Sequence, residues 1–264
     1  MKGGLIALLT DFGTRDPYVP AMKGAIYSEF PGAVIADLTH DVPRHDTASA
    51  AYHLLSVAPH FPGGTVFVCV VDPGVGSDRR ILILKRKRQI FVAPDNGILN
   101  YLIDDSRNMK CYTLKYPSDK PGISRTFHGR DLFAPAAARL AVGTPIPSIA
   151  RAVPMLRPAR LFVEIPARMK RPVTGKILHI DHFGNVITNV KLPAGRPPEN
   201  VRVTLRRKTI LLWADTYGFA PAGKPFILVG STGLLEISLR NADAAVRIGA
   251  RPGDRVTVSR APGR

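Results

Sequence analysis

The chain of 264 residues contains few cysteines and few aromatic residues. Its two cysteines, Cys69 and Cys111, are too few for a disulfide framework or a cysteine-rich zinc motif. Aromatic residues make up 7% and do not alternate with the basic runs, as base-stacking platforms would require. No apolar run approaches the ~20 residues that a membrane-spanning helix needs. These absences argue against a disulfide scaffold, a zinc ribbon, a single-strand binder and an integral membrane protein.

Acidic residues are also scarce: the chain has 20 of them and 37 lysines and arginines, which gives a net charge of +17. Such a balance is typical of proteins that bind nucleic acids, membrane surfaces or other anions. The basic residues are scattered, however, over residues 85–88, 151–171 and 202–208. This scatter favours a solvated surface and makes nucleic acid an unlikely partner. A basic nucleic-acid-binding α/β protein remains one alternative.

Several catalytic motifs are missing as well. There is no phosphate-binding G-x-x-x-x-G-K-[ST] loop, no G-x-G-x-x-G after the first predicted strand and no G-x-S-x-G nucleophile turn. Asp11, Asp72, His128 and Asp131 could form a metal site, but they lack local ligand spacing, and Arg79 would repel a divalent cation. We therefore expect no metal site, and a metal-dependent nucleoside or phosphoester hydrolase remains the second alternative.

The first part of the chain alternates strands with helices, which is typical of a doubly wound, largely parallel sheet. Strands are predicted at residues 5–9, 33–38, 66–71, 81–84 and 89–93, and helices at 17–30, 47–58 and 132–142, with a short helix after 94–97. Asp16 and Asp46 are the predicted caps of the first two helices. Residues 5–9 are too short for a signal peptide, which predicts a cytoplasmic protein.

The character of the sequence changes after residue 175. Short β-rich runs, broken by Gly, Pro, Asn and Asp, fall at residues 176–180, 186–190, 201–205, 209–213, 226–229, 234–239 and 255–258. This pattern predicts a smaller all-β barrel or sandwich. We expect two domains, 1–168 and 174–264, joined near residues 167–173, where prolines and arginines are dense.

Polar residues stand where the predicted strands end. The apolar run 66–71 stops at Asp72, and open α/β sheets keep their chemistry at the carboxyl ends of central strands. Arg79 and His128 follow at later loop positions. Each has a structural explanation when taken singly: Asp16 could be a helix cap, and Asp72 a turn residue. A carboxylate, a guanidinium and an imidazole at one sheet edge together favour a catalytic site.

Six segments carry a more specific signal. They read LLTDFGTRDPYV at 8–19, VVDPGVGSDRR at 70–80, APDNG at 93–97, FHGRDLFAPAAARL at 127–140, IDHFGNVITNV at 180–190 and GSTGLLEIS at 230–238. In order and spacing they resemble the S-adenosyl-L-methionine hydroxide adenosyltransferases, adenosine-forming hydrolases related to fluorinases and chlorinases. The resemblance implies a Rossmann-like N-terminal domain, a C-terminal β-barrel-like domain and a homotrimer with active sites between neighbouring subunits. The implied reaction converts S-adenosylmethionine and water to adenosine and methionine without a metal or cofactor.

The resemblance also assigns roles to individual residues. The catalytic triad of the family falls on Asp72, Arg79 and His128, where Arg79 is preferred to Arg80 by its spacing from Asp72. The substrate-binding positions comprise Asp11 and Asp16 for the ribose, Asp181, Asn185 and Ser231 for the methionine end, Phe183 for packing, and Asn241 and Ala242 for the adenine.

Three departures from related sequences refine this assignment. Fluorinase-like relatives have tyrosine in place of Asp72 and Tyr-Ser in place of His128-Gly129, so the resemblance implies a hydrolase rather than a halide enzyme. Pro20 replaces a glycine, and Gly230 replaces an asparagine. Neither of these two positions belongs to the triad.

Overall fold

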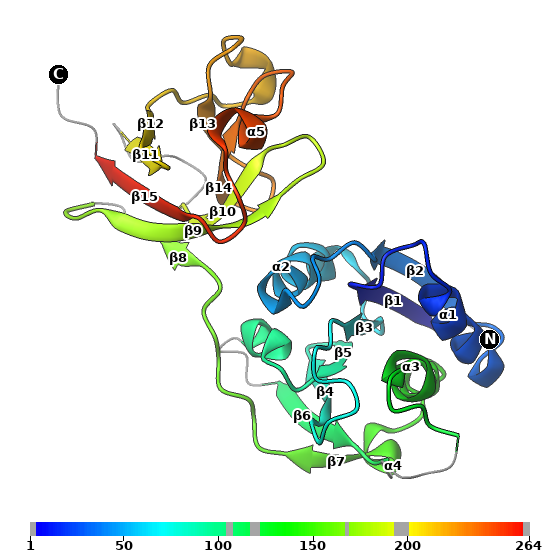
Figure 1. Ribbon diagram of the computed structural model, residues 1–264. Helices are drawn as coiled ribbons and strands as arrows, with labels where there is room; N and C mark the ends of the chain where they lie inside the picture. Colours follow the sequence, from blue (N-terminus) through cyan, green and yellow to red (C-terminus); the bar gives the residue numbers. More distant parts are fainter. Residues whose placement is uncertain (1–3, 104–107, 117–121, 167–168, 193–200, 261–264) are drawn as a thin grey trace. The chain divides into compact units, whose positions relative to one another are not determined.

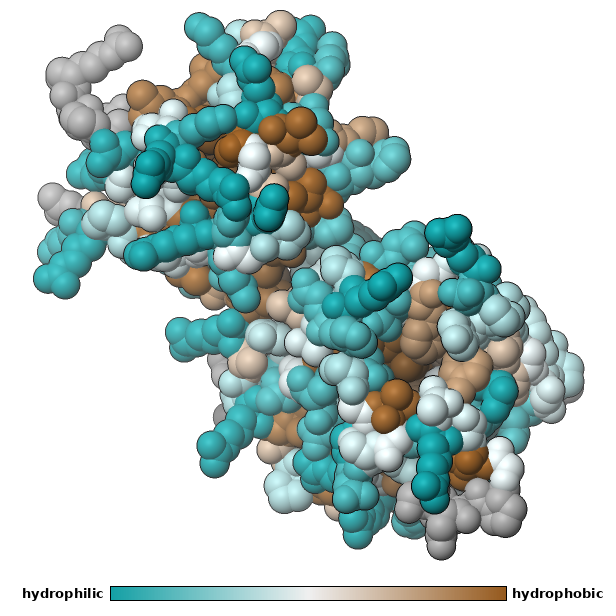
Figure 2. Space-filling view, in the orientation of Figure 1, coloured by the Kyte–Doolittle hydropathy of each residue, from teal (hydrophilic) through white to brown (hydrophobic). Residues whose placement is uncertain are grey.

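The computed structural model describes residues 4–103, 108–116, 122–166, 169–192 and 201–260, which form two compact units (Figure 1). The first unit is Met1–Ala159, and the second is Arg160–Arg264. Of the predicted joint at 167–173, residues 167 and 168 lie outside the described residues. Among the described residues, no helix combines the length and the apolar character needed to cross a bilayer. On the face shown in Figure 2, hydrophilic side chains cover most of each unit.

The first unit is built on a seven-stranded sheet in the order β2-β1-β3-β5-β4-β6-β7. The strands are β1 (Leu5–Thr10), β2 (Val34–Thr39), β3 (Val66–Val70), β4 (Ile81–Arg86), β5 (Gln89–Pro94), β6 (Met109–Leu114) and β7 (Ala150–Val153). Strands β2, β1, β3 and β5 are parallel, but β4, β6 and β7 pair in the antiparallel direction. The prediction of a largely parallel sheet thus holds for only half of it. The two-residue turn Lys87-Arg88 can join only antiparallel strands, since a parallel connection needs a long crossover.

Helices cover both faces of this sheet (Figure 1). They are α1 (Tyr18–Glu29), α2 (Thr47–Val57), α3 (Ala134–Ala141) and α4 (Ile146–Ile149), with 3₁₀ turns η1 (Ala58–His60) and η2 (Ile98–Leu102) and a π-helical turn η3 (Gly129–Phe133). Val66, Val68 and Val70 of β3 pack into one core with Met22 of α1 and Ala137 of α3. Because side chains alternate along a strand, Phe67 and Cys69 face the opposite side of the sheet, where the ring of Phe67 stacks on that of Phe91.

The helix starts test two predictions about caps. Asp46 caps α2 as predicted, since its Oδ1 accepts hydrogen bonds from the backbone N–H groups of Ala48 and Ser49, both at 3.0 Å. Asp16, by contrast, does not cap α1. The helix begins one residue later than predicted, so its N-cap is Pro17, which makes no side-chain cap bond. Asp16 is exposed and is left available for another role.

The second unit contains an eight-stranded, nearly barrel-shaped sheet in the order β12-β11-β15-β9-β10-β14-β13, with β8 beside β10. Its strands are β8 (Val163–Glu164), β9 (Val173–Ile180), β10 (Val186–Lys191), β11 (Val201–Leu205), β12 (Lys208–Ile210), β13 (Phe226–Val229), β14 (Leu234–Ser238) and β15 (Arg255–Arg260). A bridge between Trp213, just after β12, and Ile227 of β13 brings the two ends of the strand path together. All seven predicted strands are present. The short helix α5 (Ala244–Ile248) and the 3₁₀ turn η5 (Tyr217–Phe219) were not predicted.

Candidate active site

Two neighbouring strands set up the polar edge of the first unit. Strands β1 and β3 run parallel, and Thr10 pairs with Val70 at their carboxyl ends. Asp11 therefore leaves the sheet beside the segment that carries Asp72. Parallel pairing delivers carboxylates from distant parts of the sequence to one edge, as the sequence pattern predicts.

Arg79 contacts both Asp72 and His128 at this edge. Arg79 Nε donates to both carboxylate oxygens of Asp72, at 3.0 and 2.8 Å, and Nη2 donates to Oδ2 at 2.5 Å. The same Nη2 lies 2.8 Å from His128 Nδ1. The side chains of Asp72 and Arg79 are 4% and 9% exposed, so the pair is shielded from solvent. Arg80 instead pairs with Asp95 and is half-exposed.

Gly76 makes the turn between Asp72 and Arg79 possible. Its φ is +81°, a left-handed value that favours glycine, and a Cβ at this position would lie 2.5 Å from the carbonyl oxygen of Arg125. The turn therefore packs directly against the backbone that leads to His128. This close approach brings Arg79 back to both partners.

The contact with Arg79 fixes the protonation state of His128. A guanidinium has only donors, so Nη2 must donate and His128 Nδ1 must accept. A neutral imidazole that accepts at Nδ1 carries its proton on Nε2. Burial lowers the pKa of His128, and the positive charge of Arg79 lowers it further, while Asp72 and Asp131 oppose this shift. His128 is thus a neutral donor through Nε2 at neutral pH.

This arrangement predicts a pH profile. Because the pKa of His128 lies below its ordinary value of 6.5, turnover should be flat above that pH and fall only in more acidic solution. Protonation would place a proton on Nδ1, facing Arg79, and break their contact. Measuring kcat/KM against pH tests this expectation. An acid limb with its midpoint above 6.5 that disappears in His128→Asn would contradict it.

A cavity of about 390 Å³ opens beside the cluster. Asp72 and His128 line it, together with an aromatic group formed by Phe12, Tyr18 and Phe127, whose ring centroids lie 5.2 to 6.0 Å apart. These three aromatic residues were not among the predicted site residues. They come from loops and a helix start, where no periodic pattern marks them in the sequence.

The two predicted ribose residues lie near this edge but do not line the cavity. Asp11 is largely buried, and its Oδ2 accepts a hydrogen bond from the backbone N–H of His45 at 2.9 Å. Among the described residues, its Oδ1 has no hydrogen-bond partner, so this oxygen can accept from a ligand. Asp16 is exposed and makes no hydrogen bond or ion pair with another described residue.

The second unit contains a cavity of about 750 Å³. Five of the six predicted binding residues of this unit line it: Asp181, Phe183, Asn185, Asn241 and Ala242. Asp181 shapes the turn, because its Oδ1 accepts from the backbone N–H groups of Phe183 and Asn185, each at 2.9 Å. Its Oδ2 accepts from Asn185 Nδ2 at 2.9 Å.

Ser231 is the exception among these predicted residues. It is exposed in the turn between β13 and β14 and does not line this cavity. Tyr217 and Asp243 do line it, although neither was a predicted site residue. A Cβ on Gly184 would lie 2.2 Å from Asp243 Cγ, so the glycine lets the Asp181 turn pack against the start of α5. The cap pattern Asp243 to Gly249 is the sequence signal that could have revealed this element.

Comparisons with known proteins now identify the family. The model of the SAM hydroxide adenosyltransferase N-terminal domain matches residues 6–150, and that of the C-terminal domain matches residues 175–257. The chain belongs to the SAM hydroxide adenosyltransferase family. The family predicted from the six ordered segments is therefore confirmed.

Two sequence relatives and one solved structure are similar to this chain over nearly its whole length. An (R)-S-adenosyl-L-methionine hydrolase of Thermus thermophilus is 37% identical, over 94% of this chain and 96% of the relative. A fluorinase of an Actinoplanes species is 27% identical, over 97% and 98%. The crystal structure of an uncharacterized conserved protein from Thermotoga maritima aligns with a TM-score of 0.81 at 31% identity, over 97% of this chain and all of that one.

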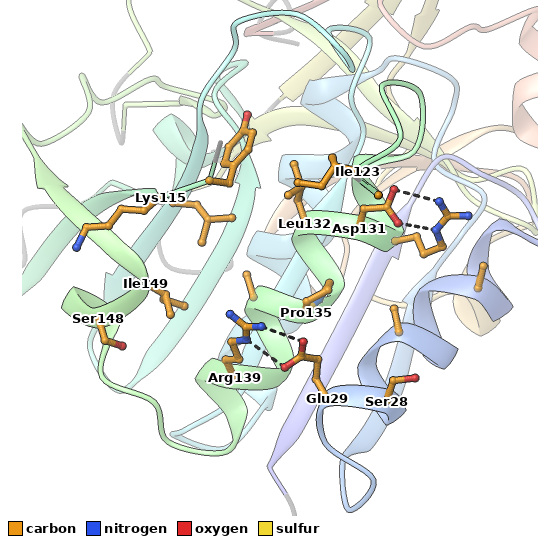
Figure 3. A pocket seen from close by; sticks show the side chains of 17 residues that line it. Ser28, Glu29, Lys115, Ile123, Asp131, Leu132, Pro135, Arg139, Ser148 and Ile149 are labelled. Carbon is orange, nitrogen blue, oxygen red and sulfur yellow. Dashed lines mark hydrogen bonds and ion pairs between the residues drawn. The ribbon is translucent and has the colours of Figure 1, made fainter. Parts of the chain in front are cut away.

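A third cavity, of about 720 Å³, lies on the first unit of this SAM hydroxide adenosyltransferase family member and shares Arg130 with the cavity beside Asp72 (Figure 3). Four of its charged side chains form two pairs, Arg139 with Glu29 at 2.9 Å and Arg130 with Asp131 at 2.6 Å, and Lys115 Nζ donates to the carbonyl oxygen of Pro147 at 3.0 Å. None of the predicted triad or binding residues lines it. Within the described ranges, no three His, Cys, Asp or Glu side chains gather in a way that could hold a metal ion.

Proposed function

We propose that this enzyme hydrolyses S-adenosyl-L-methionine to adenosine and L-methionine, by in-line attack of an activated water on C5′ of the ribose. The observation that carries the proposal is the shielded Asp72–Arg79–His128 cluster beside a cavity, in a chain of this family. Full-length relatives that carry the name (R)-S-adenosyl-L-methionine hydrolase support it. The reaction needs no metal or cofactor in this proposal.

The chemistry matches the groups present. The oxygen of water forms a bond to C5′, the C5′–S bond breaks with its electron pair moving to sulfur, and the proton that the water loses passes to the solvent. Methionine leaves as a neutral thioether, so no general acid is needed on that side. The reaction is difficult because neutral water is a weak nucleophile. A buried guanidinium favours hydroxide over water, and the Nε2–H of His128 can donate to the attacking oxygen.

Asp72 completes the cluster by orienting Arg79. Both of its oxygens accept from this guanidinium, which fixes the plane of the donors. Arg79 Nη1 is buried and has no hydrogen-bond partner among the described residues. A buried unpaired donor is costly, and an anionic oxygen in the site would satisfy it. The unpaired, positively charged donor of Arg79 therefore favours a hydroxide-like nucleophile.

The remaining assignments concern substrate binding. We assign Asp11 and Asp16 to the ribose hydroxyls, and assign to the methionine end and the adenine the residues Asp181, Phe183, Asn185, Ser231, Asn241 and Ala242. The unpartnered Oδ1 of Asp11 supports the first assignment, and the shared cavity supports the second for all but Ser231. Three further points remain predictions: a Rossmann-like fold of the first unit, domain limits at 1–168 and 174–264, and a cytoplasmic location.

Asp11→Asn should mainly weaken substrate binding. The amide keeps the shape of the side chain but loses the charge that strengthens hydrogen bonds from ribose hydroxyls, so KM should rise about tenfold while kcat changes little. Steady-state kinetics with S-adenosylmethionine tests this. An unchanged KM would show that the ribose assignment is wrong.

The proposal includes a homotrimer in which residues of the two units are supplied by neighbouring subunits. Mixing two inactive variants, Asp72→Ala and Asp181→Ala, after dissociation and reassembly tests this directly. Restored turnover is expected, because some sites would then receive both intact residues. No recovery from a demonstrably mixed oligomer would contradict the shared site.

The decisive experiment incubates the purified protein with S-adenosylmethionine and a chelator in ¹⁸O-labelled water. Adenosine and methionine should form, with the label in the 5′ hydroxyl of adenosine. Label in any other product would show attack at a different carbon. Loss of turnover with the chelator would favour the metal-dependent hydrolase instead.

A further inference from the structure

Glu236, within β14, is a buried carboxyl group that the proposed hydrolysis does not use. Glu236 is only 5% exposed, and its Oε1 accepts hydrogen bonds from Tyr217 Oη at 2.7 Å and Ser238 Oγ at 2.8 Å. The pKa of Glu236 is raised, mainly by burial. The two hydrogen bonds oppose this shift, and the negative charge of Asp181 adds to it. Carboxyl groups held in such costly surroundings concentrate at functional sites.

Tyr217 connects Glu236 to the cavity of the second unit. Its side chain lines the cavity of about 750 Å³ together with Asp181 and Asn185. Tyr217 begins the three-residue turn η5, which has no side-chain cap, and the residue is 47% exposed. Its ring meets Phe226 edge-on, with centroids 6.4 Å apart. The hydrogen bond from its hydroxyl to Glu236 fixes where the far end of the ring points.

Gly230 leaves room for the carboxyl group of Glu236. A Cβ at this position would lie 2.7 Å from Glu236 Oε2. Gly230 also closes the tight turn after β13, since its N–H donates to Leu234 O at 2.9 Å. Any residue other than glycine at position 230 would displace the carboxyl group, so the position of Glu236 depends on Gly230.

We propose that Glu236 is a positioning residue for substrate binding: its carboxyl group fixes the phenol of Tyr217, so that the ring forms a rigid wall of this cavity. The inference rests on the proposed function, because it takes this cavity to hold part of S-adenosylmethionine. The reacting cluster of Asp72, Arg79 and His128 is in the other unit. Loss of the wall should therefore weaken binding and leave the chemical step intact.

A set of variants tests the proposal through the split between KM and kcat. Glu236→Leu and Tyr217→Phe each remove the hydrogen bond, so each should raise KM about tenfold with kcat within about threefold of the wild type. The double variant should be no worse than either single one, because both remove the same interaction. Glu236→Gln keeps an acceptor oxygen and should restore KM to within about threefold. Ser238→Ala leaves the bond to Tyr217 and serves as the matched control.

Three results would overturn the proposal. One is an unchanged KM in Glu236→Leu, and another is a KM increase in the double variant equal to the product of the single ones. The third is a Glu236→Gln variant as impaired as Glu236→Leu, since charge and not hydrogen bonding would then matter. If Glu236→Leu fails to fold, Gly230→Ala displaces the carboxyl group instead and should give the same rise in KM.

A ligand-free measurement separates this inference from the proposed function. Protein labelled with 3-fluorotyrosine should give a ¹⁹F signal for position 217, assigned with Tyr217→Phe, that shifts towards the free-tyrosine value in Glu236→Leu but not in Glu236→Gln. A wild type that does not hydrolyse S-adenosylmethionine would contradict the proposed function. A signal that ignores Glu236→Leu would contradict the positioning role, whatever the activity.

Discussion

Replacing Arg79 by alanine is expected to lower kcat by about 100- to 1,000-fold, with a smaller change in KM. The guanidinium is the only cation that contacts both Asp72 and His128 among the described residues. Removing one preorganised donor from a site where negative charge develops costs about this much in other enzymes. Stopped assays that quantify adenosine released from saturating S-adenosylmethionine measure the change.

Arg80→Ala provides the matched control for this variant. Arg80 is the next residue and carries the same charge, but it pairs with Asp95 and is half-exposed. A surface ion pair contributes about 0–1 kcal/mol, so Arg80→Ala should fold and turn over much like the wild type. Equal losses in both variants would mean that net charge near this edge matters, and not the contact with Asp72 and His128.

The choice between these two arginines shows what a sequence can and cannot predict. Both follow the same strand end, and only spacing from Asp72 separates them. The structure separates them through Gly76, whose left-handed conformation and contact with Arg125 turn the chain so that Arg79 points back. Turn geometry of this kind depends on a tertiary contact, which composition and periodicity do not contain.

Strands with a continuous apolar run were predicted far better than strands that mix polar and apolar residues. The apolar runs of β1 and β3 are buried along nearly their whole length, and both were found within one residue of their bounds. Strands β6 and β7 were missed. β6 is only partly buried and mixes Lys110 and Thr113 with apolar residues, and β7 has two exposed positions among four. A strand that is only partly buried needs no continuous apolar run, so its sequence signal is weak.

Most polar residues of the candidate site were predicted, but several aromatic residues that line its cavities were not. Asp72 and Asp181 follow strands, whereas Phe12, Tyr217 and Phe127 reach the cavities from loops or short turns. Aromatic residues in loops have no periodicity to identify them, and their place depends on partners such as Glu236. The family resemblance predicted the polar residues and Phe183, and the structure added Phe12, Tyr18, Phe127 and Tyr217.

Asp72→Ala is expected to reduce kcat by about 100-fold or more, because it removes the group that orients Arg79. Without this carboxylate, a guanidinium that is 9% exposed loses three hydrogen bonds and, among the described residues, keeps only the one to His128 beside its contact with the Phe133 ring. Breaking a buried pair costs about 3–5 kcal/mol of stability, so thermal unfolding must be measured beside turnover. Asp72→Asn keeps one acceptor for Arg79 Nε and should fall between alanine and the wild type.

A second carboxylate separates loss of catalysis from loss of stability. Asp95→Ala removes the partner of Arg80 in the same region, where the pair is more exposed, and should leave kcat nearly unchanged. If Asp72→Ala unfolds well above the assay temperature and still loses turnover, the defect lies in the site. Turnover near the wild-type value in folded Asp72→Ala would remove this residue from the catalytic group, because Arg79 would then be oriented without it.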